Sequence, residues 1–75
     1  MKIDGLILIP RARSLIALPV KPRTARDVVA TFSGPVEVDD LVPDGTFAHQ
    51  KPAPSGWSLA VWNRNAHAVE GSISY

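Results

Sequence analysis

Cysteine is absent from the sequence, and methionine occurs only once in its 75 residues. The absence of cysteine excludes disulfide bonds and cysteine-based zinc sites, which are common supports of very small domains. A chain of this length forms one domain at most, so we treat residues 1–75 as a single β domain. Its stability must come from its own core or from association with other subunits.

The core that such a chain can build is small. Folding removes roughly 60% of the surface of a chain this size from water. The apolar part of that surface contributes on the order of 110 kcal/mol at about 25 cal/mol per Å². The loss of conformational entropy costs about 1.5 kcal/mol per residue, which is on the order of 110 kcal/mol for the whole chain. The two terms nearly cancel, which favours a protein supported by oligomerisation or by a larger host assembly.

Long stretches free of proline and glycine are missing too. All seven prolines and three of the five glycines lie between Pro10 and Gly56, where they interrupt every segment that could hold an ordinary helix. The remaining segments are short and rich in β-branched residues, which predicts an all-β antiparallel sandwich or small barrel of about six to seven strands. One helical turn near 23–28 or 38–42 is compatible with this pattern. The expected strands cover residues 2–9, 14–20, 27–33, 36–38, 46–48, 57–63 and 69–75.

The last third of the chain has the clearest strand pattern. Trp57, Leu59 and Val61 share one face of their strand, whereas Trp62 lies on the opposite face, as either a second core layer or an exposed contact residue. This strand ends in Asn63, a loop of small residues follows, and Val-x-Gly-x-Ile-x-Tyr closes the chain. The arrangement resembles the last hairpin of small β-sandwich modules found on bacteriophage and viral particles and in Ig-like domains. The resemblance carries no functional residue across.

Charge of one sign is not in excess. The net charge is +1, which is too near neutral for a dedicated duplex-binding protein. Basic residues nevertheless gather before Asp27, and most acids lie between Asp27 and Asp44. Folding either interleaves these charges on neighbouring strands or leaves a dipolar subunit, whose basic side meets an acidic partner or its own acidic side.

No targeting segment stands out. The apolar run 5–9 follows Asp4 and ends at Pro10, so it is too short to span a membrane and lacks a signal-peptide cleavage pattern. We therefore expect a buried strand there, no membrane partner, and a location in a virion or in the host cytoplasm.

Motifs for chemistry are missing as well. The acidic residues around Asp39 and Asp40 do not follow EF-hand spacing, and the sequence neighbours of His49 and His67 supply no further zinc ligands. No serine lies in a Gly-x-Ser-x-Gly elbow, and no phosphate-binding glycine loop occurs. The sequence thus predicts no catalytic residue, no cofactor and no metal.

Aromatic and basic residues leave one binding function open. A small single-strand nucleic-acid binder of the OB type stacks bases on aromatic rings and holds phosphates with basic side chains. Nucleic acid is the less favoured partner here, because the pattern is weak. The candidate residues are Phe32, Phe47, Trp57, Trp62 and Tyr75 with Arg11, Arg13, Arg23, Arg26 and Arg64.

The leading hypothesis is a non-enzymatic structural module that acts in many copies, such as a decoration, cement or fibre-tip protein of a phage-like particle. Its partners would be copies of itself or a larger particle protein. The alternatives are a small phage-encoded inhibitor or adaptor of a host protein, and the single-strand binder. The segment 14–20 is apolar on both faces and Pro19 places it near a sheet edge, where another chain can pair with it. The predicted interface residues are Leu15, Ile16, Leu18, Trp62, Arg11, Arg13 and Arg23.

Overall fold

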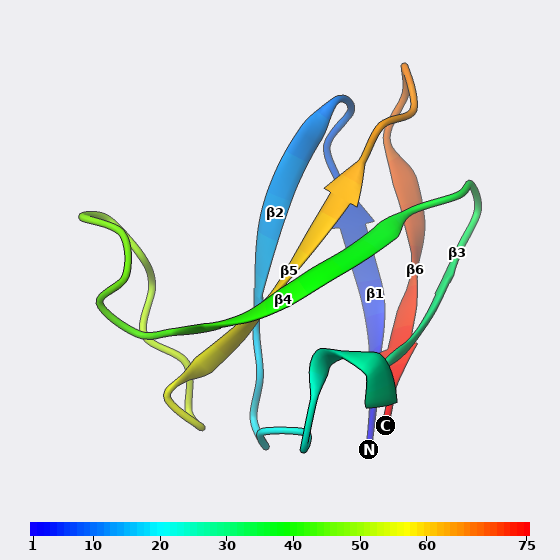
Figure 1. The fold of residues 1–75 in the computed structure, drawn as a ribbon. Coiled ribbons are helices and arrows are strands. Elements are labelled where there is room, and N and C mark those ends of the chain that lie inside the picture. The colour runs from blue at the N-terminus through cyan, green and yellow to red at the C-terminus, as the bar shows by residue number, and fades with distance from the viewer.

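Two three-stranded antiparallel sheets face each other in the computed structural model, which describes residues 1–75 (Figure 1). This arrangement confirms the expected small all-β class. No helix has the length and apolar character needed to cross a membrane. A single 3-10 turn, η1 (Ala25–Asp27), lies where one helical turn was expected. The first sheet has the order β1 (Lys2–Leu8), β6 (Val69–Ser74), β3 (Val29–Phe32), and the second has the order β2 (Ala12–Ala17), β5 (Trp57–Asn63), β4 (Glu37–Pro43).

Strand β5 is the central strand of its sheet because its sequence is apolar on both faces. Leu59 and Val61 point into the core between the sheets, while Ser58 and Ala60 on the outer face are also buried. A central strand covered on both sides is expected to be almost continuously apolar, as this one is. The predicted bounds of this strand, residues 57–63, are confirmed.

The core draws on both sheets and on the segments that follow β2 and precede β3. The folded chain exposes 4713 Å², close to the roughly 4,500 Å² expected for a folded protein of this mass. The buried cluster therefore has the size of an ordinary small domain. Its members are Leu8, Ile16, Leu18, Val28, Leu59, Val61, Val69 and Ile73.

One buried polar residue ties the two sheets together. Asn63 continues the inward-facing series of Leu59 and Val61, and it is completely buried. Its side-chain amide nitrogen donates to the carbonyl oxygens of Leu8, Ile9 and His67, each at 3.1 Å. Because Leu8 ends β1 in the other sheet, these bonds join the sheets at one end of the sandwich.

The chain path differs from the expected one at its C-terminal end. β5 and β6 belong to different sheets, so residues 57–75 do not form a hairpin; the loop after Asn63 crosses from one sheet to the other. The only strands that are neighbours both in sequence and in a sheet are β4 and β5, joined by the long loop 44–56. Packing explains this crossing. The inward-facing residues Leu59 and Val61 of β5 and Val69 and Ile73 of β6 are all fully buried, so the two strands lie on opposite sides of one core.

Two further expectations near β4 are corrected. The strand expected at 46–48 is absent, because Thr46 and Phe47 donate their backbone N–H groups to the side-chain oxygen of Gln50 instead of to a strand. The sequence Val42-Pro43-Asp44-Gly45 predicts a tight turn, but the turn runs from Pro43 to Thr46, one residue later, with Gly45 at φ +82. Glycine is favoured at position 45 because residues with a side chain rarely adopt a positive φ.

Candidate functional site

The predicted interface strand is an edge strand, but half of its apolar residues point inward. β2 lies at one edge of its sheet, as expected. Ile16 is 7% exposed and Leu18 is 0% exposed, and both belong to the core cluster. These two side chains are packed in the core of the folded monomer, so a partner at this edge would meet Leu15 and the strand backbone instead. Leu15 lies half-buried on the opposite, outer face, next to Ala60 of β5.

Trp62 lies on the outer face of the β2-β5-β4 sheet. Arg13 of β2 and Glu37 of β4 are its direct neighbours across the sheet. The guanidinium of Arg64 stacks 4.8 Å from the centre of the indole ring, and its Nε donates to a Glu37 carboxylate oxygen at 2.6 Å. A cation over an aromatic face is attracted by the ring electrons. Trp62 is thus a half-buried surface residue that lies against the Arg64–Glu37 ion pair.

A second guanidinium is arranged in the same way. Arg13 forms an ion pair with Asp39 at 3.3 Å, and this pair spans β5 because the two residues belong to the strands on either side. The same guanidinium lies 6.0 Å from the ring of Phe47. The fold therefore brings a basic residue of the N-terminal part next to an acidic residue of the middle part of the chain. We call this surface the Trp62 face and define it by Arg13, Glu37, Asp39, Phe47, Trp62 and Arg64.

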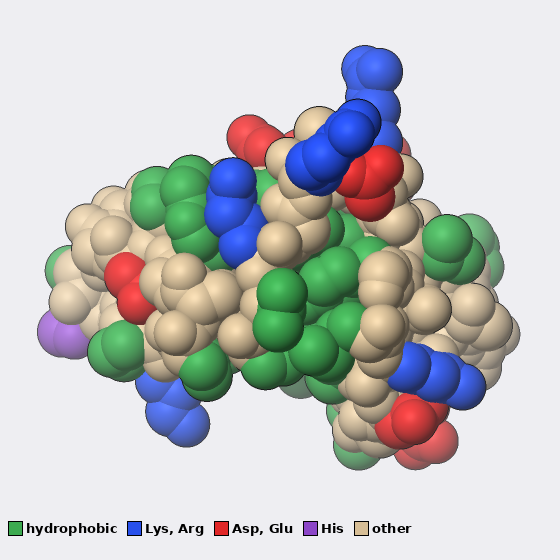
Figure 2. Space-filling model, turned by 90° about the horizontal axis from the view of Figure 1, so that it is seen from below, with side chains coloured by type: hydrophobic (Ala, Val, Ile, Leu, Met, Phe, Trp, Pro, Cys, Tyr) green, Lys and Arg blue, Asp and Glu red, His purple; other side chains and the backbone are tan.

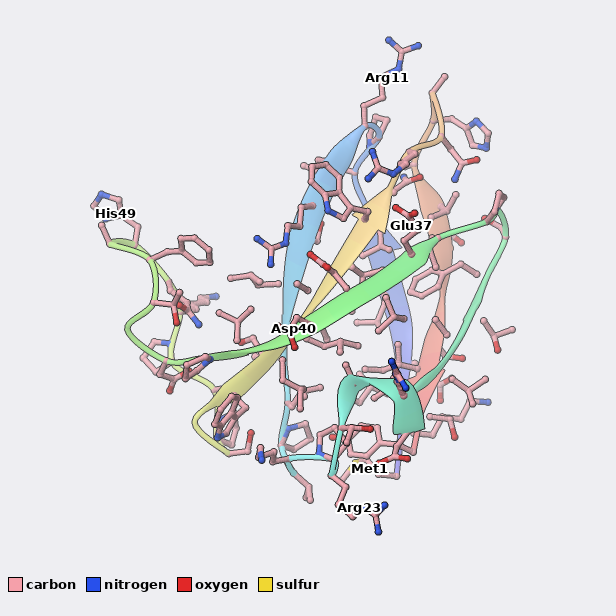
Figure 3. All side chains as sticks on the ribbon, viewed as in Figure 1. Met1, Arg11, Arg23, Glu37, Asp40 and His49 are labelled. Carbon is pink, nitrogen blue, oxygen red and sulfur yellow. The ribbon has the colours of Figure 1, made fainter.

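Two shallow hollows meet at Trp62. The larger has a volume of about 340 Å³ and is lined by Pro35, Val36, Glu37, Trp62, Arg64 and Asn65. The smaller has a volume of about 200 Å³ and is lined only by Arg11, Trp62 and Arg64. Arg11 lies at the far end of the sandwich from the termini (Figure 3). Every side chain of the smaller hollow is thus either an indole or a guanidinium.

The opposite end of the sandwich has a different character. The chain termini lie there side by side, with the Met1 amino group donating to the Tyr75 carbonyl oxygen at 2.7 Å. The Tyr75 hydroxyl donates to the Val20 carbonyl oxygen. Seen from this end, apolar side chains gather at the centre, and both basic and acidic side chains stand around them (Figure 2). Met1 and Val20 are each 52% exposed and Val29, whose neighbour across the sheet is Ser74, is 63% exposed.

We call this end the terminal surface and define it by Met1, Val20, Val29 and Tyr75. Lys21 follows Val20 directly and Arg23 comes two residues later, so the predicted interface residue Arg23 lies at this end of the molecule, near Met1 (Figure 3). Lys21 also lies 4.7 Å from the ring centre of Trp57. An apolar patch rimmed by charged side chains is typical of a protein contact.

Two residues were assigned only part of their role from the sequence. Arg64 was a candidate for phosphate binding but was not among the predicted interface residues, although the strand period of two places it on the same side as Trp62. Asn63 was noted only as the end of a strand, although the same period continues the buried face of Leu59 and Val61 onto it. The Asp44 carboxylate accepts the backbone N–H of Ala53 at 3.2 Å and so closes the loop 44–56.

Comparison with known proteins gives no match to a family model, to a curated protein or to a solved structure. The functional argument therefore depends on the two surfaces alone.

Proposed function

We propose that this protein is a non-enzymatic contact module that acts in multiple copies, as a small structural component of a virion-type particle. The observation that carries the proposal is the terminal surface. Its large apolar side chains stay about half exposed in a chain that has few core residues to spare. Burial of Met1, Val20 and Val29 against a protein partner would add apolar contact that the monomer lacks.

The charges around the terminal surface support an oriented contact. Lys21 and Arg23 form no ion pair within the chain, since the salt bridges of the protein involve Lys2, Arg13 and Arg64. Lys21 lies over the Trp57 ring and Arg23 has no ion-pair partner in the chain, so this rim favours a partner that presents a carboxylate opposite Arg23. A copy of the same chain or a larger particle protein is the partner that we propose.

The first experiment measures mass against concentration by gel filtration with light scattering. We expect the wild type to exceed its monomer mass of 8.1 kDa as concentration rises. Val20→Asp should return it to the monomer, because a carboxylate would then lie inside the apolar contact. Ile9→Asp is the matched control: Ile9 is equally apolar and exposed, but it lies at the other end of β1.

Three outcomes decide the proposal. Association that Val20→Asp removes and Ile9→Asp leaves intact supports it, and quantitative mass spectrometry of purified particles then tests for many copies per particle. A wild type that stays monomeric and fails to bind any particle overturns it. A one-to-one complex with a single host protein, without self-association, favours the inhibitor or adaptor function instead.

A further inference from the structure

The smaller hollow beside Trp62 has a composition suited to one kind of ligand. The three residues that line it are Trp62, Arg11 and Arg64, which bring one indole and two guanidinium-bearing side chains to the hollow. We propose that this hollow binds single-stranded nucleic acid, with one base against the Trp62–Arg64 stack and the flanking phosphates on Arg11 and Arg64. The inference concerns the Trp62 face and does not depend on the terminal surface.

The backbone of Arg11 is the first argument. Arg11 has φ +51 and is the only residue other than glycine with a positive φ. That conformation suits glycine or asparagine, and other residues adopt it at a cost of about 1–2 kcal/mol. The Arg11 side chain offsets none of this cost, because it forms no hydrogen bond or ion pair within the chain and extends freely from the tip of the sandwich (Figure 3). A strained position occupied by a free cation points to a function outside the fold.

The geometry of Arg64 is the second argument. Glu37 occupies its Nε and the indole lies against its plane, so the terminal nitrogens of the guanidinium are left to donate outward. The side chain is therefore already oriented before a ligand arrives, which lowers the entropy lost on binding. Bases stack on guanidinium planes as well as on aromatic rings.

The repeat of the pattern along the face is the third argument. Phe47 and Arg13 form a second aromatic and guanidinium pair next to the first. The Trp62 face carries two guanidiniums, of Arg13 and Arg64, each paired with a carboxylate, and Arg11 at the smaller hollow adds one unpaired cation. A single strand presents planar bases and anions in alternation, which matches alternating rings and cations; an acidic peptide presents the anions without the bases.

The test titrates the protein with a short oligothymidylate and follows intrinsic tryptophan fluorescence. Two phosphate contacts predict a slope of about −1.4 for the logarithm of affinity against the logarithm of salt concentration. Trp62→Ala should lower the affinity about tenfold, within the range measured for loss of one stacked base. In Trp62→Ala the remaining tryptophan fluorescence comes from Trp57, so binding by this variant is followed instead by the fluorescence anisotropy of a labelled oligonucleotide.

Arg11→Gly separates binding from folding. Glycine relieves the strain at φ +51, so this variant should melt at a higher temperature than the wild type while its salt slope falls by about 0.7. Arg23→Gln, which removes a cation at the opposite end, is the matched control and should bind as the wild type does. Val20→Asp should also bind normally, so failure of the proposed contact function is distinguished from failure of this site.

The results that overturn the proposal are specific. Absence of binding at low salt, or equal losses in Arg11→Gly and Arg23→Gln, would exclude a nucleic-acid site here. Equal binding of a polyglutamate peptide would reduce the hollow to a general anion contact. If Trp62→Ala instead changes the oligomer mass without affecting the oligonucleotide, Trp62 is a protein contact, as the sequence suggested.

Discussion

Removal of the Asn63 side chain should weaken the fold more than any other polar substitution in the chain. The amide nitrogen has two hydrogens for three carbonyl oxygens, so Asn63→Ala removes about two net hydrogen bonds. These contribute about 1 kcal/mol each, and the buried Leu8 carbonyl left without a donor adds about 1–3 kcal/mol. The expected loss is about 3–5 kcal/mol.

That loss is large for so small a domain. Unfolding free energies of about 0.05–0.15 kcal/mol per residue give on the order of 4–11 kcal/mol for the whole chain. A domain of this size loses about 4–8 °C of melting temperature per kcal/mol, so Asn63→Ala should melt at least about 12 °C below the wild type. Asn63→Asp should be worse, because a carboxylate oxygen would then face three carbonyl oxygens without a donor.

Urea unfolding followed by tryptophan fluorescence is the assay, and the dependence of free energy on urea should stay unchanged. Asn65→Ala is the graded control. Asn65 donates to the Asn63 side-chain oxygen and to the Pro35 carbonyl, but it is only partly buried, so water replaces these bonds and the loss should be about 1 kcal/mol. A loss below about 1 kcal/mol for Asn63→Ala, or an Asn63→Asp variant as stable as the wild type, would refute the role of Asn63 in joining the sheets.

Two further predictions concern the packing of each sheet. Gly71→Ala should destabilise the protein by at least about 3 kcal/mol in the same urea assay, because a Cβ there would lie 2.0 Å from the Thr31 carbonyl oxygen and 2.6 Å from the Phe32 Cα. Ser72→Ala, at the neighbouring outer position, is the control and should change stability by no more than about 0.5 kcal/mol. Equal effects of the two substitutions would contradict the close approach of β3 to β6. Ile16→Glu should unfold the monomer, since it buries a charge in the core, whereas Leu15→Glu on the outer face should keep the β-sheet circular dichroism; a folded Ile16→Glu monomer would mean that β2 is packed the other way round.

The sequence predicted the strand content well where local chemistry decides it. The bounds of β5 follow from an apolar segment between Gly56 and the polar loop that begins at Arg64, and β1 is recovered to within one residue. Proline and glycine exclude long helices whatever the tertiary structure, so the all-β class could be predicted from sequence alone. The inward face of β6, with Val69, Gly71 and Ile73, follows from its period of two.

Sequence reasoning failed where a contact joins residues far apart in the chain. Alternation along β2 did not tell which face is the core, because both faces are apolar and only packing against the other sheet selects Ile16 over Leu15. Strand order decides that Arg13 pairs with Asp39 and that Arg11 lies near Trp62 and Arg64. Local propensity carries no information about strand order. The sequence by itself thus determined the kind of fold and most strand segments. The tertiary structure alone decided which side chains face solvent together, because the same strands in another sheet order would bury the same residues but assemble different surfaces.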